Sequence, residues 1–352
     1  MIKQFKAQWF KSNMALVLSF IFIMLVAAGC GSSTTVAPKA EVPKAEVPKV
    51  EAPKAEETKK STAIDFPTKD IEVVYTSSAG SGGDIYLRTL GKAVEKDLGK
   101  SWVVNNLVGA SGANAWNYVA KAKPDGYTLL GVSSNLITAP ILSKMPVSYT
   151  NFEPIALMFI DPMVFFVPEN SPLKSIKDVV ETAKTKPGKL KFAGGTPGAL
   201  GFVAGTELMK AAGFEIVIVP FEGGGDAAVT VLGGHLDGGI GEYAEIASSV
   251  EAGKLRIIGA FNKIPSLPNI QTVAEAGYPQ VKVEKMRGVA APKGTPVEVI
   301  DKLVEILKKS YDDPVFKKYY EANQLLPYFK AKGDFLKVME EQDKQVKETI
   351  SK

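Results

Sequence analysis

Strand-like and helix-like segments alternate along the chain from residue 71 to its C-terminal part, with only short turns between them. An apolar run, IEVVYT at 71–76, is followed by an amphipathic stretch at 84–98 whose apolar side chains recur at helical spacing. This alternation predicts βα units, and therefore an α/β fold in which each sheet is mostly parallel and flanked by helices. Residues 64–352 form a body of about 290 residues, which is large for one core and suits two lobes.

Small residues collect at the turns where strands pass into helices, in two sets along the chain. These turns are TSSAGSGGD, LVGASGAN, VSSN, AGGTPGAL, EGGGD and GGIGEYAE. In open α/β sheets, ligands bind outside the carboxyl ends of the strands, which is where these turns are expected. We therefore expect two lobes whose binding edges face each other, with a ligand cleft between them that closes about a hinge in the crossing strands.

The first of these turns suits an anion but does not match a nucleotide fingerprint. Gly80 and Gly82 are followed by Ile85 where the third glycine of G-x-G-x-x-G belongs, and no Lys-Ser/Thr pair opens the helix. Backbone N–H groups at a helix start lack intrahelical partners and carry the positive end of the helix dipole, and glycine lets a ligand approach them. The alternative is a tight turn that Asp84 caps and that binds nothing. The residues of this one turn fit both interpretations equally well.

The chain has few residues able to carry catalysis. His235 is its only histidine and Cys30 its only cysteine. Because we expect Cys30 to carry a lipid, as argued below from the N-terminal segment, thiol catalysis and cysteine metal sites are excluded. No G-x-S-x-G motif supplies a nucleophilic serine, and carboxylates at helix starts, such as Asp84 and Glu242, are usually caps. We expect His235 to begin a strand and to be partly exposed. These residues argue against a hydrolase or transferase, so we expect no enzyme, no metal and no cofactor.

The formal net charge of +4 is small and the lysines are dispersed along the chain. Nucleic-acid-binding proteins instead gather Lys and Arg in a stripe or patch. We therefore expect no nucleic-acid partner.

The N-terminal 30 residues are typical of a targeting segment. Lysines precede an apolar run of 16 residues, Met14–Gly29, which is short for a membrane span and usual for a secretory signal. The run ends in Ala28-Gly29-Cys30, which resembles a bacterial lipobox, although Ala27 stands where that box usually has leucine. We expect removal of residues 1–29 and acylation of Cys30, which anchors the chain to the bilayer. The alternative is an ordinary signal peptide with an incidental cysteine.

Residues 30–63 carry a five-residue repeat of proline, lysine, small apolar residues and glutamate. Proline at every fifth position blocks continuous helix and strand, and the alternating charges keep the segment solvated. At ~3.1 Å per residue such a tether spans on the order of 100 Å. Such a tether would let the body move at that distance from the membrane while Cys30 stays anchored in the bilayer.

Taken in order, the motifs of the body resemble the extracytoplasmic solute-binding proteins of tripartite tricarboxylate transporters, the Bug family. The resemblance runs from Phe66 to about Lys347. One segment, VPFEGGGDAAVTVLGGHLDGGIG, is similar to the family pattern Val-Pro-Tyr-Lys-Gly…Leu-Leu-Gly-Gly-Gln-Val-Asp. The other six motifs are GSGGDIYLR, GASGAN, KAKPDGYTLL, KPGKLKFAGGTPGA, LPNIQTVAEAGYP and GVAAPKGTP. Seven motifs in one order indicate the family, where any one alone would be weak.

The resemblance implies a two-lobe, periplasmic-binding-protein-like fold of type II, with residues 64–163 and 286–352 in lobe one and 164–285 in lobe two. It implies a monomeric receptor outside the cytoplasm that captures a small carboxylate: a di- or tricarboxylate, an amino or hydroxy acid, or an aromatic acid. The receptor would deliver this ligand to the membrane subunits of a secondary transporter. The alternative is a ligand-sensing lipoprotein of the same fold that signals to a partner receptor.

Carried over position by position, the resemblance places the carboxylate on backbone N–H groups and hydroxyls from the turns of both lobes. The expected ligand-binding residues are Ser78, Ser81, Gly82, Gly83, Asp84, Ser111, Gly112, Ser133, Ser134, Gly195, Thr196 and Glu242.

The chain departs from the family pattern at two positions. Glu242 stands where many members have Asp-Asn or similar, and Arg287 stands near where an aromatic residue often precedes the strand that returns to lobe one. Glu242 either selects a ligand with an amino or hydroxyl donor, because it would repel a bare carboxylate, or caps the next helix. Arg287 is either a counter-charge in the cleft or a solvated residue at the hinge.

Overall fold

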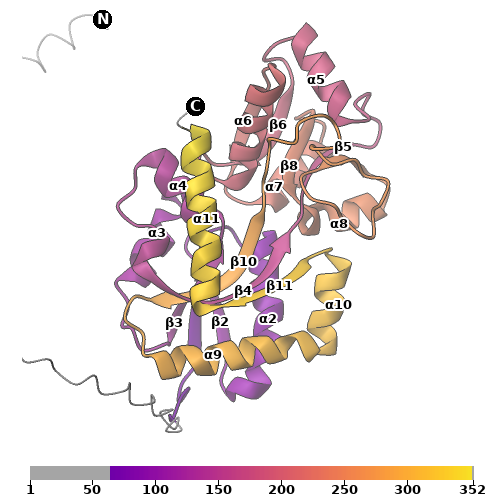
Figure 1. Cartoon of the computed structure of the whole chain (residues 1–352). Helices are drawn as coiled ribbons and strands as arrows, with labels where there is room; N and C mark the ends of the chain where they lie inside the picture. The colour runs from indigo at the N-terminus through magenta and orange to yellow at the C-terminus, as the bar shows by residue number, and fades with distance from the viewer. Residues whose placement is uncertain (1–63, 351–352) are drawn as a thin grey trace, which may run out of the picture. The chain divides into compact units, whose positions relative to one another are not determined.

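The computed structural model describes residues 64–350 (Figure 1). The signal peptide, the acylation of Cys30 and the tether of residues 30–63, all expected from the sequence, lie outside the described residues. None of the helices in the described part is long and apolar enough to cross a membrane.

The first sheet has six strands in the order β11-β4-β10-β3-β1-β2. β10 and β11 run against the other four strands, and β1 pairs in parallel with β2 and β3. The strands are β1 (Ile71–Tyr75), β2 (Trp102–Asn106), β3 (Thr128–Ser133), β4 (Phe152–Asp161), β10 (Lys285–Pro292) and β11 (Leu326–Ala331).

The second sheet has five strands in the order β7-β6-β8-β5-β9. β6 is parallel to both of its neighbours, whereas β5 runs antiparallel to β8 and β9. The strands are β5 (Met163–Pro168), β6 (Lys191–Gly195), β7 (Val217–Phe221), β8 (Gly238–Glu242) and β9 (Leu255–Ala260).

Both sheets are mixed: most strands of each sheet share one direction, and β10 and β11 in the first sheet and β5 in the second run the other way. The chain leaves the first sheet along β4 and returns to it along β10, and these two strands pair side by side, with Lys285 opposite Asp161. Strands that carry the chain in opposite directions must pair antiparallel. Only Pro162 separates the end of β4 from the start of β5, so no helical crossover intervenes there. The α/β class itself is as expected.

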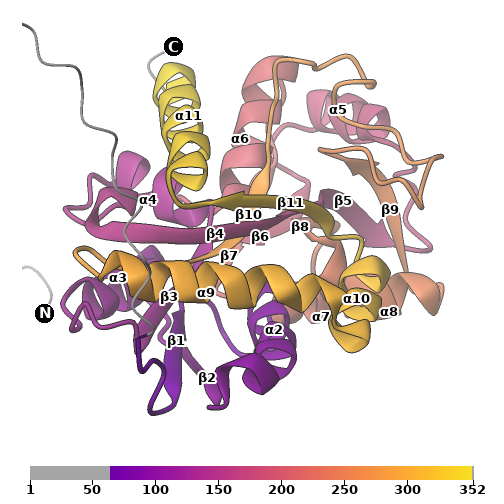
Figure 2. The same ribbon diagram turned by 60° about the horizontal axis from the view of Figure 1, so that its bottom comes forward.

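Helices cover both faces of each sheet, so that four layers of helices enclose the strands (Figures 1 and 2). α2, α9 and α10 pack on one face of the first sheet and α3, α4 and α11 on the other; α5 and α6 cover one face of the second sheet, and α7 and α8 the other. The helices are α2 (Gly82–Leu98), α3 (Ala113–Ala120), α4 (Asn135–Ser143), α5 (Ile176–Thr185), α6 (Leu200–Ala212), α7 (Gly224–Leu232), α8 (Tyr243–Glu251), α9 (Val297–Lys309), α10 (Pro314–Ala322) and α11 (Lys332–Ile350).

The strands divide their side chains between two cores because neighbouring residues of a strand point to opposite faces. In β5, Phe165 packs with α5 and α6, whereas its neighbours Val164 and Phe166 pack with α7 and α8. In β1, Val73 and Val74 divide in the same way between the two faces of the first sheet. Burial on both faces explains why these strands are continuous apolar runs in the sequence. We call the first sheet with its helices the first lobe, and the second sheet with its helices the second lobe.

The N-terminus of α10 allows a test of helix capping in the layer formed by α2, α9 and α10. Asp313 is its N-cap, and the carboxylate accepts hydrogen bonds from the backbone N–H groups of Val315 and Phe316, both at 3.0 Å. We expect Asp313→Ala to lower the free energy of unfolding by about 1 kcal/mol, because two N–H groups lose their acceptor. Urea denaturation measures the loss. Asp312→Ala is the control, since the neighbouring aspartate is exposed and makes no cap; equal effects of the two substitutions would contradict the assignment.

Candidate ligand-binding site

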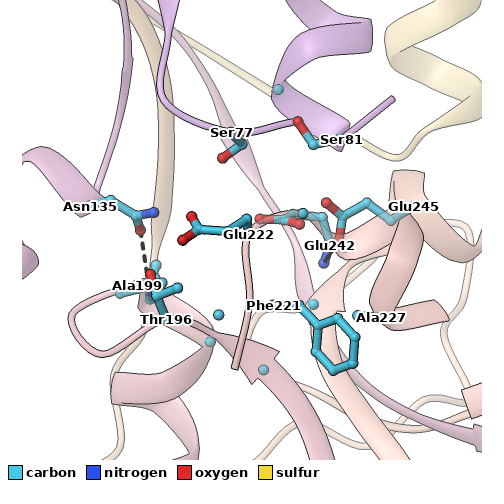
Figure 3. Close-up of a pocket in the computed structure, with 18 of the residues that line it drawn as sticks. Ser77, Ser81, Asn135, Thr196, Ala199, Phe221, Glu222, Ala227, Glu242 and Glu245 are labelled. Carbon is cyan, nitrogen blue, oxygen red and sulfur yellow. Dashed lines mark hydrogen bonds between the residues drawn. The ribbon is translucent and has the colours of Figure 1, made fainter. Parts of the chain in front are cut away.

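A cavity of about 70 Å³ lies where the strand ends of the two lobes meet (Figure 3). Its first-lobe wall follows β1, the start of α2, the turn at 111–112 and the start of α4. Its second-lobe wall follows the ends of β6, β7 and β8 and the helix starts after them. The polar side chains and the charged side chains of the lining include Ser77, Ser81, Ser111, Asn135, Thr196, Glu222, Glu242, Glu245, Lys285 and Arg287.

Seven of the twelve residues expected from the sequence line this cavity. They are Ser81, Gly83, Ser111, Gly112, Gly195, Thr196 and Glu242. They come from both lobes, and the turns that the sequence singled out bring them together. Their role in ligand binding is taken up below as a proposal.

The other five, Ser78, Gly82, Asp84, Ser133 and Ser134, do not line the cavity. The carboxylate of Asp84 turns back on its own helix, accepting from the N–H of Gly80 at 2.9 Å and from Arg88 at 2.9 Å. Burial alone would raise the pKa of Asp84, but these hydrogen bonds outweigh it and hold the pKa below its usual value.

The serines at the end of β3 serve the fold. The hydroxyl of Ser134 donates to the carbonyl of Glu284 and accepts from the N–H of Met286, both at 2.9 Å, and so fixes the start of β10. Ser133 is buried within β3, opposite Arg287 in the strand register. The small residues at the end of β3 therefore hold the start of β10 in place and do not line the cavity.

A buried ion pair stands behind the cavity, between the two crossing strands. Arg287, 1% exposed, lies 2.6 Å from the carboxylate of Asp161 through Nη2 and donates to it from Nε at 2.8 Å. Its Nη1 donates to the hydroxyl of Tyr75 at 2.7 Å. Arg287 is therefore neither a solvated hinge residue nor a free counter-charge: it borders the cavity, but Asp161 already neutralises it.

Glu242 is also ion-paired. It forms a salt bridge with Lys285 and lies 3.6 Å from Nη2 of Arg287, and it occupies the N-cap position of α8. Burial and the neighbouring Arg287 lower the pKa of Lys285 to about 7. The charge of Glu242 is thus compensated by residues of β10, which argues for its structural reading over direct selection of a ligand.

Glu245 occupies the anion site that the glycine-rich turn provides. Its carboxylate, from the first turn of α8, accepts the N–H of Gly82 at the start of α2 at 3.2 Å and the N–H of Glu242 at 3.3 Å. Gly224 at the start of α7 also lies against this carboxylate, since a side chain there would collide with Oε2 of Glu245. The N-termini of three helices from both lobes therefore converge on one carboxylate, as the dipoles of helix starts favour. Burial nonetheless raises the pKa of Glu245 to about 7.

Sequence analysis missed Ser77, Asn135, Glu222, Glu245 and Lys285 in the lining. Glu222 had a visible signal, since it stands where the family pattern has lysine. Glu245 ends the predicted turn GGIGEYAE, but its contact could not be predicted, because the glycine whose N–H it accepts lies 163 residues away in the chain. His235 does not begin a strand: it is exposed in the turn before β8 and does not line the cavity. Within residues 64–350, no group of His, Cys, Asp and Glu side chains is arranged to hold a metal ion.

The raised pKa of Glu245 predicts a dependence of stability on pH. The folded state binds a proton at this group up to about pH 7, and the unfolded state only up to about pH 4.5, so ionisation costs stability as the pH rises between these values. Glu245→Gln keeps an acceptor without the charge. We expect this variant to gain stability relative to the parent by on the order of 1–3 kcal/mol between pH 4.5 and 7, measured by urea denaturation at both ends. Glu251→Gln, exposed on the same helix, is the control; a difference that does not change with pH would contradict the prediction.

The amino-acid sequence of this chain is similar to those of known proteins. The tripartite tricarboxylate transporter family receptor (TctC) model matches residues 86–352. Protein BugT of Bordetella pertussis is 30% identical over 246 residues, which cover 68% of this chain and 75% of BugT.

Solved structures share the fold. The periplasmic binding protein BugD superposes with a TM-score of 0.74 and 29% identity, covering 81% of this chain and 96% of BugD. MatC from Rhodopseudomonas palustris, solved with bound malate, has a TM-score of 0.74 at 22% identity, covering 81% of this chain and all of that chain. An R. palustris protein solved with adipate has a TM-score of 0.77 at 24% identity, with 82% and 98% covered. The two-sheet architecture is therefore that of a periplasmic binding protein.

The family match spans most of the described chain, and the similarities to BugT and BugD indicate the same family. This chain therefore belongs to the tripartite tricarboxylate transporter receptor family, as a Bug-type solute-binding receptor.

Proposed function

We propose that this protein captures a small carboxylate in the cavity between its lobes and delivers it to the membrane subunits of a tripartite tricarboxylate transporter. One observation carries the proposal: strand ends and helix starts of both lobes present hydroxyl, amide and backbone N–H groups to one small cavity. A carboxylate needs such hydrogen-bond donors and no fixed partner charge. The malate and adipate bound in two structures of the same fold support a carboxylate ligand.

Asn135 and Thr196 are the donors that we place on the carboxylate. The side-chain oxygen of Asn135, from the first lobe, accepts the N–H of Leu200 in the second lobe at 3.0 Å, which leaves its amide N–H groups for a ligand (Figure 3). Thr196 borders the cavity at the end of β6. The same hydrogen bond of Asn135 joins the lobes across the cavity, so we expect ligand binding and lobe closure to be coupled.

The size of the cavity favours a small acid. A buried water takes about 10–15 Å³ on the same scale, so about 70 Å³ holds on the order of five waters. A compact mono- or dicarboxylate fits this space, and a nucleotide does not.

The anchoring and delivery steps belong to the same proposal. Removal of residues 1–29, acylation of Cys30 and a tether over residues 30–63 would hold the lobes near the membrane subunits. The lobes would be those of the two sheets, with boundaries one residue away from the predicted 163/164 and 285/286, because Met163 begins β5 and Lys285 begins β10. A sensing lipoprotein that reports ligand to a partner receptor is the second candidate. Loss of carboxylate uptake on deletion of this protein supports delivery, whereas unchanged uptake with altered gene expression supports sensing.

A ligand screen tests the binding step. We expect at least one compound of a panel of di- and tricarboxylates, amino acids, hydroxy acids and aromatic acids to raise the melting temperature of the chain expressed from residue 31. At about 100 times its Kd, a ligand stabilises the folded state by ~2.7 kcal/mol, which is a readable shift. Stabilisation by phosphate or nucleotides alone, or by nothing in the panel, would contradict the proposal.

Thr196→Val then tests the site with the compound so found. We expect affinity to fall roughly tenfold to a hundredfold in isothermal titration calorimetry, since hydrogen bonds to charged groups contribute ~1.5–3 kcal/mol. Thr185→Val, at an exposed position outside the cavity, is the matched control and should bind as the parent does. Unchanged affinity of Thr196→Val would place the carboxylate elsewhere.

A further inference from the structure

The charges that line the cavity are not all accounted for. Arg287 is neutralised by Asp161, Lys285 pairs with Glu242, and Glu245 accepts hydrogen bonds from helix N-termini. Glu222 is different. Glu222 is an exposed residue of the cavity lining, and within residues 64–350 its carboxylate makes no hydrogen bond and no ion pair.

Glu222 stands at a point where its charge faces the ligand space. It follows β7 directly, and Gly223 after it is the N-cap of α7, so the backbone there is fixed by a strand and a helix. Figure 3 shows its carboxylate in the space that Ser77, Asn135 and Thr196 border. Donors for a carboxylate and a free acceptor for a cation therefore lie around one cavity.

The lining offers no cation to balance Glu222. The cations among its residues, Lys285 and Arg287, already have carboxylate partners. The carboxylate of Glu222 is therefore left without a cation partner among the lining residues. Closing the lobes on a ligand with only negative charges would bring like charges together, and a protein discriminates against such ligands through that repulsion.

A second polar group points to a ligand at the same cavity. Ser81, only 4% exposed, borders it, and its hydroxyl has no hydrogen-bond partner in the protein. Buried hydroxyls are normally hydrogen-bonded, so a ligand that supplies both donor and acceptor groups would complete this site.

We propose that the ligand of this receptor is a carboxylate that also carries an ammonium group, as an amino acid does, and that Glu222 accepts the ammonium while the donors opposite hold the carboxylate. The inference rests on the proposed carboxylate-binding function and narrows its ligand class. It also moves the selection of a donor-bearing ligand from Glu242, whose charge is paired, to Glu222.

Ligand pairs that differ only in the ammonium group test this directly. The probes are L-alanine with propionate, L-aspartate with succinate, L-glutamate with glutarate, and L-phenylalanine with 3-phenylpropionate, each titrated calorimetrically into the chain expressed from residue 31. We expect the amino acid of at least one pair to bind ten times or more tighter than its partner. Glu222→Gln should remove most of that preference, and Glu222→Lys should reverse it in favour of the plain acid.

The outcomes separate this inference from the function on which it rests. If a plain acid binds as tightly as its amino counterpart, or if Glu222→Gln leaves the ratio of the two dissociation constants unchanged, the ammonium site is refuted while carboxylate capture stands. If no carboxylate of either kind binds to the folded protein, both are refuted. Glu251→Gln, an exposed glutamate of the second lobe outside the cavity, controls for a general change in charge and should keep the parent's ratio.

Discussion

Arg287 is the residue on which the geometry of this receptor depends. A buried guanidinium is costly unless it is paired and hydrogen-bonded, and removing one partner of such a pair is strongly destabilising. Here the partners come from three places: Asp161 at the end of β4, Tyr75 at the end of β1 and, at 3.6 Å, Glu242 at the end of β8. Because the ends of these strands meet around one charge, the two sheets are held together at their strand ends, and the cavity forms beside that junction.

The crowded backbone around this junction follows from the same requirement. A Cβ on Gly83 would lie 1.9 Å from the hydroxyl of Tyr75 and 2.6 Å from Nη1 of Arg287, and one on Gly224 would lie 1.7 Å from Oε2 of Glu245. Both helix starts therefore need glycine, to let charged side chains approach the backbone closely. The turn at the start of α2 was predicted to suit an anion, and the carboxylate that its backbone meets in this structure is that of Glu245.

Sequence patterns predicted the parts of this molecule that are local. The apolar runs and helical spacing located the strands and helices, and the small residues at strand ends located the turns that supply Ser111, Gly195 and Thr196 to the cavity. The reversed direction of β5, β10 and β11 was not predicted, because side chains alternate in the same way in a parallel and an antiparallel strand. Pairings such as Gly82 with Glu245 escaped as well, since only the folded chain brings together helices that are so distant in sequence.

The single residue between β4 and β5 limits how the lobes can move. Proline fixes φ at Pro162 and also restricts the residue before it, Asp161, whose side chain is held by Arg287. One of the connections between the lobes is therefore a stiff pivot with almost no slack. Any rotation of one lobe against the other about this connection would move the charged junction beside Pro162 less than the far rims of the cavity.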